Sequence, residues 1–462
     1  MLFHSLQFLF FLPLVFVLYW SVAEHRVARQ LLLFVASMIF YMAWNPAPAL
    51  LILYLSSCDY FLARSIERTE RRIVRKLLVT LSVFNNLSVL GVFKYADWLT
   101  KSVVDIAAHL GVTLVYKPLG LILPVGLSFV AFQCLSYTID VYRGELKARR
   151  SWLELTLFIS FFPQIVAGPI VRAADFLPQL DQKPVLSEGD GARGLFRIAA
   201  GFFKKLVIAD LLSANLVDRV FAEPGNYTGI EVTAAVFSYT AQIYYDFSAY
   251  SDIAIGCAAL FGFQLKENFD KPYLSVNLFE FWRRWHMSLG TWLRDYLYVP
   301  LGGNRGSKLR TCWNLWVTMI LGGIWHGADW RFVVWGAVHG VVLIVNRILW
   351  WTFGKPKKDR PFATKLMEAR IVFRAPDISA SWEVFVAQFK AGLSAPNLTP
   401  LVLTVMAAAT IGHILPHRFY DRLTQVFIWA PVPIRAVALL ALALGVKEVS
   451  SFEVQPFIYF QF

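Results

Sequence analysis

The feature that most limits what this chain can fold into is a series of apolar segments with almost no charge, such as residues 31–44, 49–62 and 77–93. Each approaches the length of about 20 residues that a helix needs to cross the hydrocarbon core of a bilayer. Hydrophobic residues make up 57% of the 462 and charged residues only 16%, against about 25% charged residues in a typical soluble domain. Since the buried share of a domain's surface levels off as the domain grows, a soluble domain cannot hide this much apolar surface. The composition therefore excludes a soluble enzyme, a disordered chain and a nucleic-acid-binding protein, and it indicates a membrane protein.

Basic residues mark the loops that we expect in the cytoplasm. Lys and Arg number 44 against 31 Asp and Glu, which gives a formal charge of +13. Many of them cluster in residues 64–76 and 143–150, between apolar segments. Loops rich in Lys and Arg stay on the cytoplasmic side of a membrane. Counting three crossings back from residues 64–76 predicts that the N-terminus lies outside, in the periplasm.

The apolar pattern predicts an all-α polytopic membrane protein with about 11 transmembrane helices, together with re-entrant and interfacial helices. Residues 153–171 contain proline and glycine breaks that are typical of a re-entrant segment. Residues 232–263 and 313–351 are too long for one straight crossing at about 1.5 Å per residue. We expect each to hold two crossings or a broken helix. Natural places for the break in the second segment are Gly322, Gly323 and Gly327.

The chain divides into three predicted parts. Residues 1–353 form the transmembrane core, and residues 398–462 form C-terminal transmembrane helices. Between them, residues 354–397 combine a basic cytoplasmic loop with an amphipathic helix. In that helix apolar residues recur at steps of three and four from Trp382 to Leu393, a pattern typical of a helix lying on the membrane surface.

Polar residues inside the apolar chain gather in a few places, and ionisable residues at membrane depth are functional candidates by default. The first place is residues 281–298, where spacing predicts one helix with two faces. The aromatic face consists of Trp282, Trp285, Leu289, Trp292 and Tyr296. The other face consists of Arg283, His286, Gly290 and Arg294. The second face suits an anionic group such as a phosphate, although an interfacial helix with snorkelling arginines would show the same pattern.

The second place is residues 322–330, where His326 lies at a glycine-flanked break. A histidine there is either a buried hydrogen-bonded residue or a general base in a desolvated pocket. His339, thirteen residues later, is more typical of packing. In residues 244–252 the pairs Asp246–Tyr250 and Ser248–Asp252 each lie one helical turn apart, and they fit a polar channel or interhelical hydrogen bonds.

The sequence shows no metal-binding spacing, no nucleotide-binding motif and no nucleophile elbow. Acyl transfer is the simplest remaining reaction, because one base and one partner for the oxyanion are enough.

An ordered set of motifs resembles the membrane-bound O-acyltransferase family, and within it the alginate O-acetylation branch of bacteria. Trp-His-Gly alone would be a weak signal, but the ordered set runs almost from end to end. The matching stretches are residues 124–129, 136–144, 162–170, 245–252, 268–273 (Asn-Phe-Asp-Lys-Pro-Tyr), 281–298, 300–306 (Pro-Leu-Gly-Gly-Asn-Arg-Gly), 325–327 and 456–462.

The resemblance implies a bundle of helices around a central tunnel, with catalytic residues at His326 and His286. Candidates for binding the substrate or donor are Arg283, Arg294, Asp295, Asp246, Tyr250 and Trp325. It also implies an O-acetyltransferase of the bacterial inner membrane that takes an acetyl group from cytoplasmic acetyl-CoA, with no cofactor and no metal. A periplasmic SGNH-type acetyltransferase would then place the acetyl group on an exopolysaccharide of the alginate or cellulose type. The expected partners are thus acetyl-CoA, this transferase, the exopolysaccharide and the lipid bilayer, with no nucleic acid.

Two other functions stay open. A D-alanyl transferase for teichoic acid shares the Trp-Arg-Arg-Trp-His motif of residues 282–286, whereas residues 301–306 and the Phe-Gln-Phe ending favour the alginate branch. A transporter without chemistry of its own would usually show paired half-repeats with broken helices, and the sequence shows none.

Overall fold

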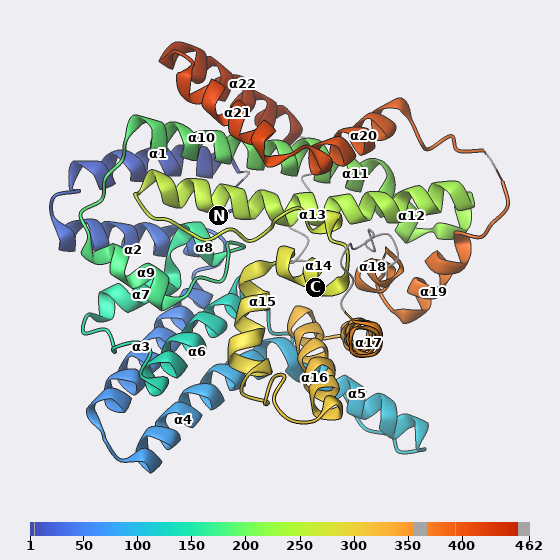
Figure 1. The fold of residues 1–462 in the computed structure, drawn as a ribbon, viewed down its shortest axis with the longest axis horizontal. Coiled ribbons are helices and arrows are strands. Elements are labelled where there is room, and N and C mark those ends of the chain that lie inside the picture. Colours follow the sequence, from blue (N-terminus) through green and yellow to red (C-terminus); the bar gives the residue numbers. More distant parts are fainter. Residues whose placement is uncertain (4, 355–366, 393, 451–462) are drawn as a thin grey trace. The chain divides into compact units, whose positions relative to one another are not determined.

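The computed structural model describes residues 1–3, 5–354, 367–392 and 394–450, and every regular element in these ranges is a helix (Figure 1). The prediction of an all-α protein is therefore confirmed for the described residues. Most of the basic stretch after residue 354 and the terminal motif of residues 456–462 lie outside them.

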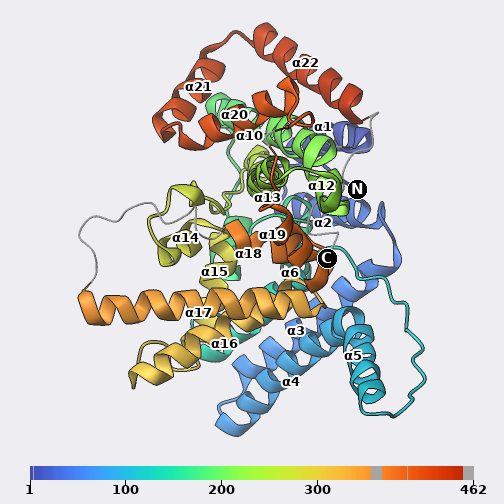
Figure 2. The same cartoon turned by 90° about the vertical axis from the view of Figure 1, so that its right-hand side faces the viewer.

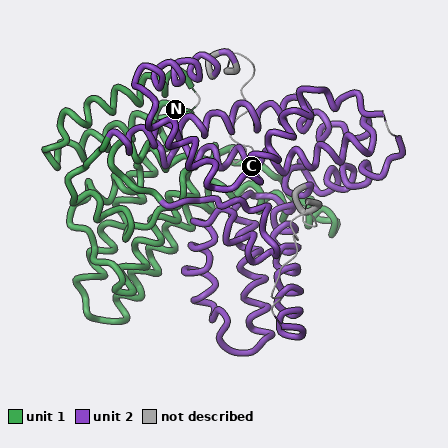
Figure 3. Tube along the Cα trace, turned by 45° about the horizontal axis from the view of Figure 1, so that its top comes forward, with its two compact units in different colours: residues 1–187, 257–265 green, residues 188–256, 266–462 purple. Residues whose placement is uncertain are grey.

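Two compact units make up the chain, and Figure 3 colours them separately. The first unit comprises residues 1–187 and 257–265, and the second comprises residues 188–256 and 266–462. The predicted division into a core, a basic loop and C-terminal helices concerns membrane topology, and it stays a prediction.

The described residues of the first unit form ten helical elements of their own, besides the last turn of α13 (Gly229–Leu260). They are α1 (Leu6–Ser21), α2 (Arg26–Met42), α3 (Ala47–Arg68), α4 (Arg72–Leu90), the π-helical segment η1 (Gly91–Tyr95), α5 (Ala96–His109), α6 (Leu127–Arg143), α7 (Trp152–Ser160), α8 (Phe162–Ile165) and α9 (Ala173–Asp181). Helices α3, α4 and α6 pack on one another around the buried Asp59. Its carboxylate accepts hydrogen bonds from Asn86 and Thr138, both at 2.7 Å, and from Ser82. Such interhelical hydrogen bonds hold apolar helices together where the hydrophobic effect cannot.

The second unit holds the remaining elements. They are α10 (Glu188–Phe202), η2 (Phe203–Ala209), α11 (Asp210–Leu212), η3 (Ser213–Val217), α12 (Asp218–Ala222), η4 (Pro224–Asn226), α13 (Gly229–Leu260), η5 (Pro272–Leu274), α14 (Leu278–Arg284), α15 (Met287–Leu293), η6 (Arg294–Tyr298), α16 (Lys308–His326), α17 (Trp330–Phe353), α18 (Met367–Arg374), α19 (Ile378–Ala387), α20 (Pro400–Ile414), α21 (His417–Trp429) and α22 (Val432–Ser450). The last turn of α13 belongs to the first unit.

Three helical stretches of the described residues are long and apolar enough to cross a membrane: Ala47–Arg68, Arg72–His109 and Trp330–Phe353. Helices α20 and α21 count as a fourth if they are taken as one span bent by 98°. The predicted total of about 11 crossings is not shown by these lengths and stays a prediction. On α19 the side chain of Trp382 is 65% exposed, as expected for an apolar face that lies against lipid.

The prediction of a break within residues 232–263 is wrong, because α13 runs unbroken through 32 residues. Its polar side chains are matched by the neighbouring segments of the second unit: Asp246 pairs with Lys205 at 2.9 Å, and Asp252 pairs with Lys204 at 2.6 Å. No glycine or proline lies between residues 230 and 255. A helix whose polar groups are paired in this way has no need to unwind.

The other two predicted breaks are present. Residues 313–351 fold as α16 and α17, which are separated at Gly327, while Gly322 and Gly323 lie inside α16. Residues 153–171 contain α7 and α8, which have only nine and four residues and are separated at Phe161. Neither helix alone is long enough to span a bilayer.

Helices α16 and α17 pack side by side over their length (Figure 2). Glycines allow this close approach. A Cβ atom at Gly323 would lie 2.2 Å from the carbonyl oxygen of Phe332, and one at Gly336 would lie 2.5 Å from that of Met319. Because His326 ends α16, this contact fixes where its imidazole lies.

We predict that Gly336→Ala lowers stability by about 1–3 kcal/mol, because the new methyl group meets backbone that cannot move aside. Thermal unfolding of the purified protein in detergent measures this as a lower midpoint temperature. The matched control is Gly322→Ala, whose methyl would meet only the end of the Leu293 side chain at 3.3 Å. Equal midpoints for the two variants would contradict the close packing described here.

Candidate active site

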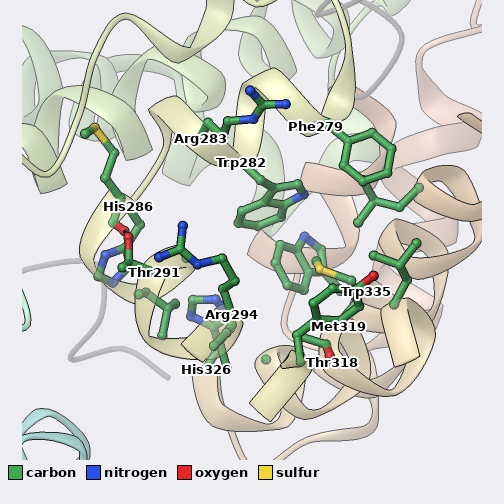
Figure 4. Close-up of a pocket in the computed structure, with 18 of the residues that line it drawn as sticks. Phe279, Trp282, Arg283, His286, Thr291, Arg294, Thr318, Met319, His326 and Trp335 are labelled. Carbon is green, nitrogen blue, oxygen red and sulfur yellow. Dashed lines mark hydrogen bonds between the residues drawn. The ribbon is translucent and has the colours of Figure 1, made fainter. Parts of the chain in front are cut away.

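A cavity of about 330 Å³ lies in the second unit, between α14, α15, η6, α16 and α17. Figure 4 shows imidazole and guanidinium side chains around it. Among the described residues that line it are two histidines, His286 and His326, and three arginines, Arg283, Arg294 and Arg347. None of those lining residues is acidic. The electrostatic environment therefore favours an anionic ligand.

His286 lies where the chain breaks between α14 and α15. The single helix that spacing predicts over residues 281–298 is wrong at this point, because His286 has φ +44°, in the left-handed region. A distant segment causes the break. The amide of Met287 donates to the backbone oxygen of Asn268 at 2.9 Å, and the amide of Ser288 donates to the Asn268 side chain at 3.3 Å. These bonds satisfy amides at the start of α15 that lack helical partners.

The ring of His286 is 1% exposed and is enclosed by aromatic side chains. Ring centroids lie 4.7 Å from Phe247 and 6.1 Å from Trp325. On its polar side, Nδ1 lies 3.2 Å from Oδ1 of Asn268. The residue thus faces the cavity from a rigid apolar setting with a fixed hydrogen-bond partner.

His326 reaches the same cavity from α16, as its last residue. Its ring packs 5.0 Å from Trp325, 5.3 Å from Trp335 and 5.4 Å from Phe373. The next residue, Gly327, has to be glycine, because a Cβ there would lie 2.0 Å from the ring of Phe332. The glycine-flanked break predicted around His326 is therefore confirmed.

His339 packs against the walls of the cavity and is not among its lining residues. Its ring lies 4.4 Å from Trp335 and 5.4 Å from Trp282. Both tryptophans line the cavity. This placement agrees with the packing role expected from the sequence.

The four residues on the predicted basic face, Arg283, His286, Gly290 and Arg294, all line the cavity. On the aromatic face Trp285 and Trp292 are buried away from the cavity, whereas Trp282 and Leu289 also line it. Arg294 is 62% exposed at the rim and pairs with Asp295, Nε to Oδ1, at 2.6 Å. The four residues of the basic face thus reach one cavity even though the helix is broken at His286.

Arg347 is a lining residue that the sequence predictions missed. Its guanidinium carbon lies 4.8 Å from the ring centre of Phe279 and 5.9 Å from that of Trp350. An arginine inside the apolar run of α17 is itself a signal, since charged residues within such segments usually face a cavity. Asn268 was missed as well, and only its place in the matching stretch of residues 268–273 pointed to it.

The structure does not bring Asp246 and Tyr250 to this cavity. Both lie on α13 beside the buried Lys205, which pairs with Asp246 at 2.9 Å and with Asp210 at 2.8 Å. The Tyr250 ring centre is 5.9 Å from Lys205 Nζ. Trp325 and Asp295 touch residues of the cavity wall without lining it. The binding roles expected for these four residues stay predictions.

Comparison with known proteins gives one consistent picture. Residues 49–365 match the model of MBOAT, the membrane-bound O-acyltransferase family. A probable alginate O-acetylase of Azotobacter vinelandii is 37% identical over the full length of both chains. A probable alginate O-acetylase of Pseudomonas aeruginosa is 38% identical over 92% of this chain and 83% of its own. A peptidoglycan O-acetyltransferase of Helicobacter pylori is 36% identical over 75% of this chain and 70% of its own.

Proposed function

Because the chain belongs to the membrane-bound O-acyltransferase family, we propose that this acyltransferase moves an acetyl group from cytoplasmic acetyl-CoA across the bacterial inner membrane. The acetyl group is destined for an exopolysaccharide of the alginate or cellulose type. The observation that carries the proposal is the cavity itself, where two histidines from separate helices share one space with three arginines. The relatives named as O-acetylases and as an O-acetyltransferase support acetyl as the transferred group.

The chemistry assigned to His326 is general base catalysis. Its imidazole takes the proton of an acceptor hydroxyl while the hydroxyl oxygen attacks the carbonyl carbon of the thioester. The new C–O bond forms, the C–S bond breaks, and the proton passes from His326 to the departing sulfur, which leaves as free CoA thiol. His286 and nearby hydrogen-bond donors position the acetyl group or stabilise the oxyanion.

The arginines of the cavity bind the phosphate groups of acetyl-CoA. Guanidinium groups bind phosphate through paired N–H donors, and Arg283 and Arg294 are exposed at the rim of the cavity. The phosphate-bearing end of CoA can therefore stay at the rim while the acetyl thioester reaches the histidines. Arg347, packed on Phe279, adds a third positive charge to the same space.

The proposed acceptor lies on the periplasmic side of the membrane. A periplasmic SGNH-type acetyltransferase receives the acetyl group and places it on the polysaccharide. The proposed orientation rests on the basic residues 64–76, which cover the junction of two candidate spans, and on three crossings before them; it puts the N-terminus in the periplasm.

Two alternative functions differ from the proposed one in what happens to acetyl-CoA. A teichoic acid D-alanyl transferase would release no thiol from acetyl-CoA and would require a D-alanyl carrier. A transporter would neither hydrolyse labelled acetyl-CoA nor transfer its label. The relatives named for O-acetylation match three quarters or more of this chain, which favours acetyl transfer.

We predict that His326→Ala lowers polysaccharide acetylation in cells by about 10²- to 10⁴-fold, the usual contribution of a general base. Ester content of the polymer is the readout, with expression verified in the membrane fraction. His109→Ala, at the exposed end of α5, is the control and should acetylate normally. Full acetylation by a normally expressed His326→Ala variant would contradict the role of His326 as the general base.

A second prediction concerns the arginines. Arg283→Gln, Arg294→Gln and Arg347→Gln should each weaken acetyl-CoA binding by about 10- to 100-fold, because one charge-assisted contact to phosphate contributes about 1.5–3 kcal/mol. Equilibrium binding to the purified protein measures this. S-acetylpantetheine, which lacks the phosphates, should bind all variants equally, and Arg193→Gln on α10 is the control variant. Unchanged acetyl-CoA affinity would show that these arginines only anchor their helices.

A further inference from the structure

Asn268 is a buried polar residue that connects three parts of the second unit. It lies in the loop that follows α13 and is 1% exposed. Its Nδ2 donates to Ser251 Oγ on α13 at 3.2 Å, and its Oδ1 accepts from Ser288 Oγ on α15 at 2.9 Å. The same Oδ1 lies 3.2 Å from Nδ1 of His286.

The orientation of the Asn268 amide follows from its partners. The backbone N–H of Ser288 faces the amide at 3.3 Å, and a backbone N–H can only donate. The atom it meets must therefore be the oxygen. That oxygen also faces His286, so His286 meets a group that accepts hydrogen bonds and has no proton to give.

This geometry selects one tautomer of His286. To bond to Oδ1 the Nδ1 atom must carry a proton, and in a neutral imidazole the lone pair then lies on Nε2. Ser288 Oγ also lies 3.4 Å from Nδ1, but its single proton is engaged in the shorter bond to Oδ1. Unconstrained histidine side chains prefer the opposite tautomer, so the protein imposes this one.

We propose that Asn268 is a positioning residue that holds His286 with its proton on Nδ1, so that His286 offers a hydrogen-bond acceptor, Nε2, to the substrate. The inference rests on the proposed acyl transfer and refines it. A neutral His286 in this state cannot donate to the oxyanion. Its partner is instead a hydroxyl of the acceptor or an amide N–H of the donor.

The oxyanion then needs a donor other than His286. Trp282 lines the cavity, and its indole Nε1 is buried with no hydrogen-bond partner among the described residues. An indole N–H is a donor only, and Figure 4 shows the ring at the cavity. The backbone of His286 is also held in place by its surroundings, because a residue other than glycine keeps a left-handed φ only where its neighbours impose it.

The direct test is the ¹⁵N spectrum of the side chains in purified protein labelled at histidine. The His286 signals are identified by their loss in His286→Gln. At neutral pH we expect protonated Nδ1 and unprotonated Nε2 in the wild-type chain, and a shift toward protonated Nε2 in Asn268→Leu. Protonated Nε2 in the wild-type chain would overturn the inference without touching the proposed function.

The kinetics of acetyl transfer give a second, independent test, in which each variant is compared with the wild-type protein. Asn268→Leu should lower kcat by up to about 100-fold, because a small misplacement of a catalytic group can cost that much, with KM for acetyl-CoA nearly unchanged. Asn268→Asp, which keeps an acceptor oxygen, should recover most of that loss. Ser251→Ala, which removes a bond of Asn268 on the side away from His286, is the matched control and should cost far less.

Thermal unfolding separates this role from a merely structural one. If Asn268→Leu unfolds near the wild-type temperature and has wild-type kcat, the inference fails. Equal losses of kcat in Asn268→Leu and Asn268→Asp would also overturn it. If the wild-type chain transfers no acetyl group at all, the proposed function fails first.

Discussion

The site depends on a few hydrogen bonds that reach across the chain to the break at His286. Without the backbone oxygen and side chain of Asn268, the amides that begin α15 would be buried without partners at a cost of about 1–3 kcal/mol each. With them, α14 ends at Arg284 and α15 begins at Met287, and only Trp285 and His286 lie between the two helices. The break lets residues from α14 and α15 converge on one cavity, so that His286 and Arg283 line the same space. The glycine-mediated contact of α16 with α17 brings His326 to that cavity from the other side.

The sequence alone predicted the helical class and the break at Gly327, because apolar length predicts helices and glycine permits a break beside an aromatic ring. The four residues of the basic face all line the cavity, but the single helix from which their spacing was read is broken at His286. The two corrections have a common cause. The break at His286 and the continuity of α13 are both decided by partners distant in sequence, Asn268 in one case and Lys204 and Lys205 in the other.

Arg347 shows a second reason why the sequence alone cannot predict the whole site. It lies 64 residues after Arg283 (347 − 283), and no spacing rule connects the two. Only the packing of α14 against α17 and of η6 against α16 gathers the three guanidinium groups. The same packing places indole and phenyl rings around His286 and His326. Electrostatic contacts made beside such apolar rings are less screened than contacts in open water.

The central claim is that this cavity transfers an acetyl group from acetyl-CoA, and release of free CoA thiol tests it most directly. The measurement uses purified wild-type protein with acetyl-CoA, the periplasmic SGNH-type transferase and its carbohydrate acceptor, beside the same mixture with the His326→Ala variant. The account predicts thiol release that depends on His326 and is matched by labelled ester on the acceptor. Intact acetyl-CoA with the folded wild-type chain, or equal release by His326→Ala, would contradict it.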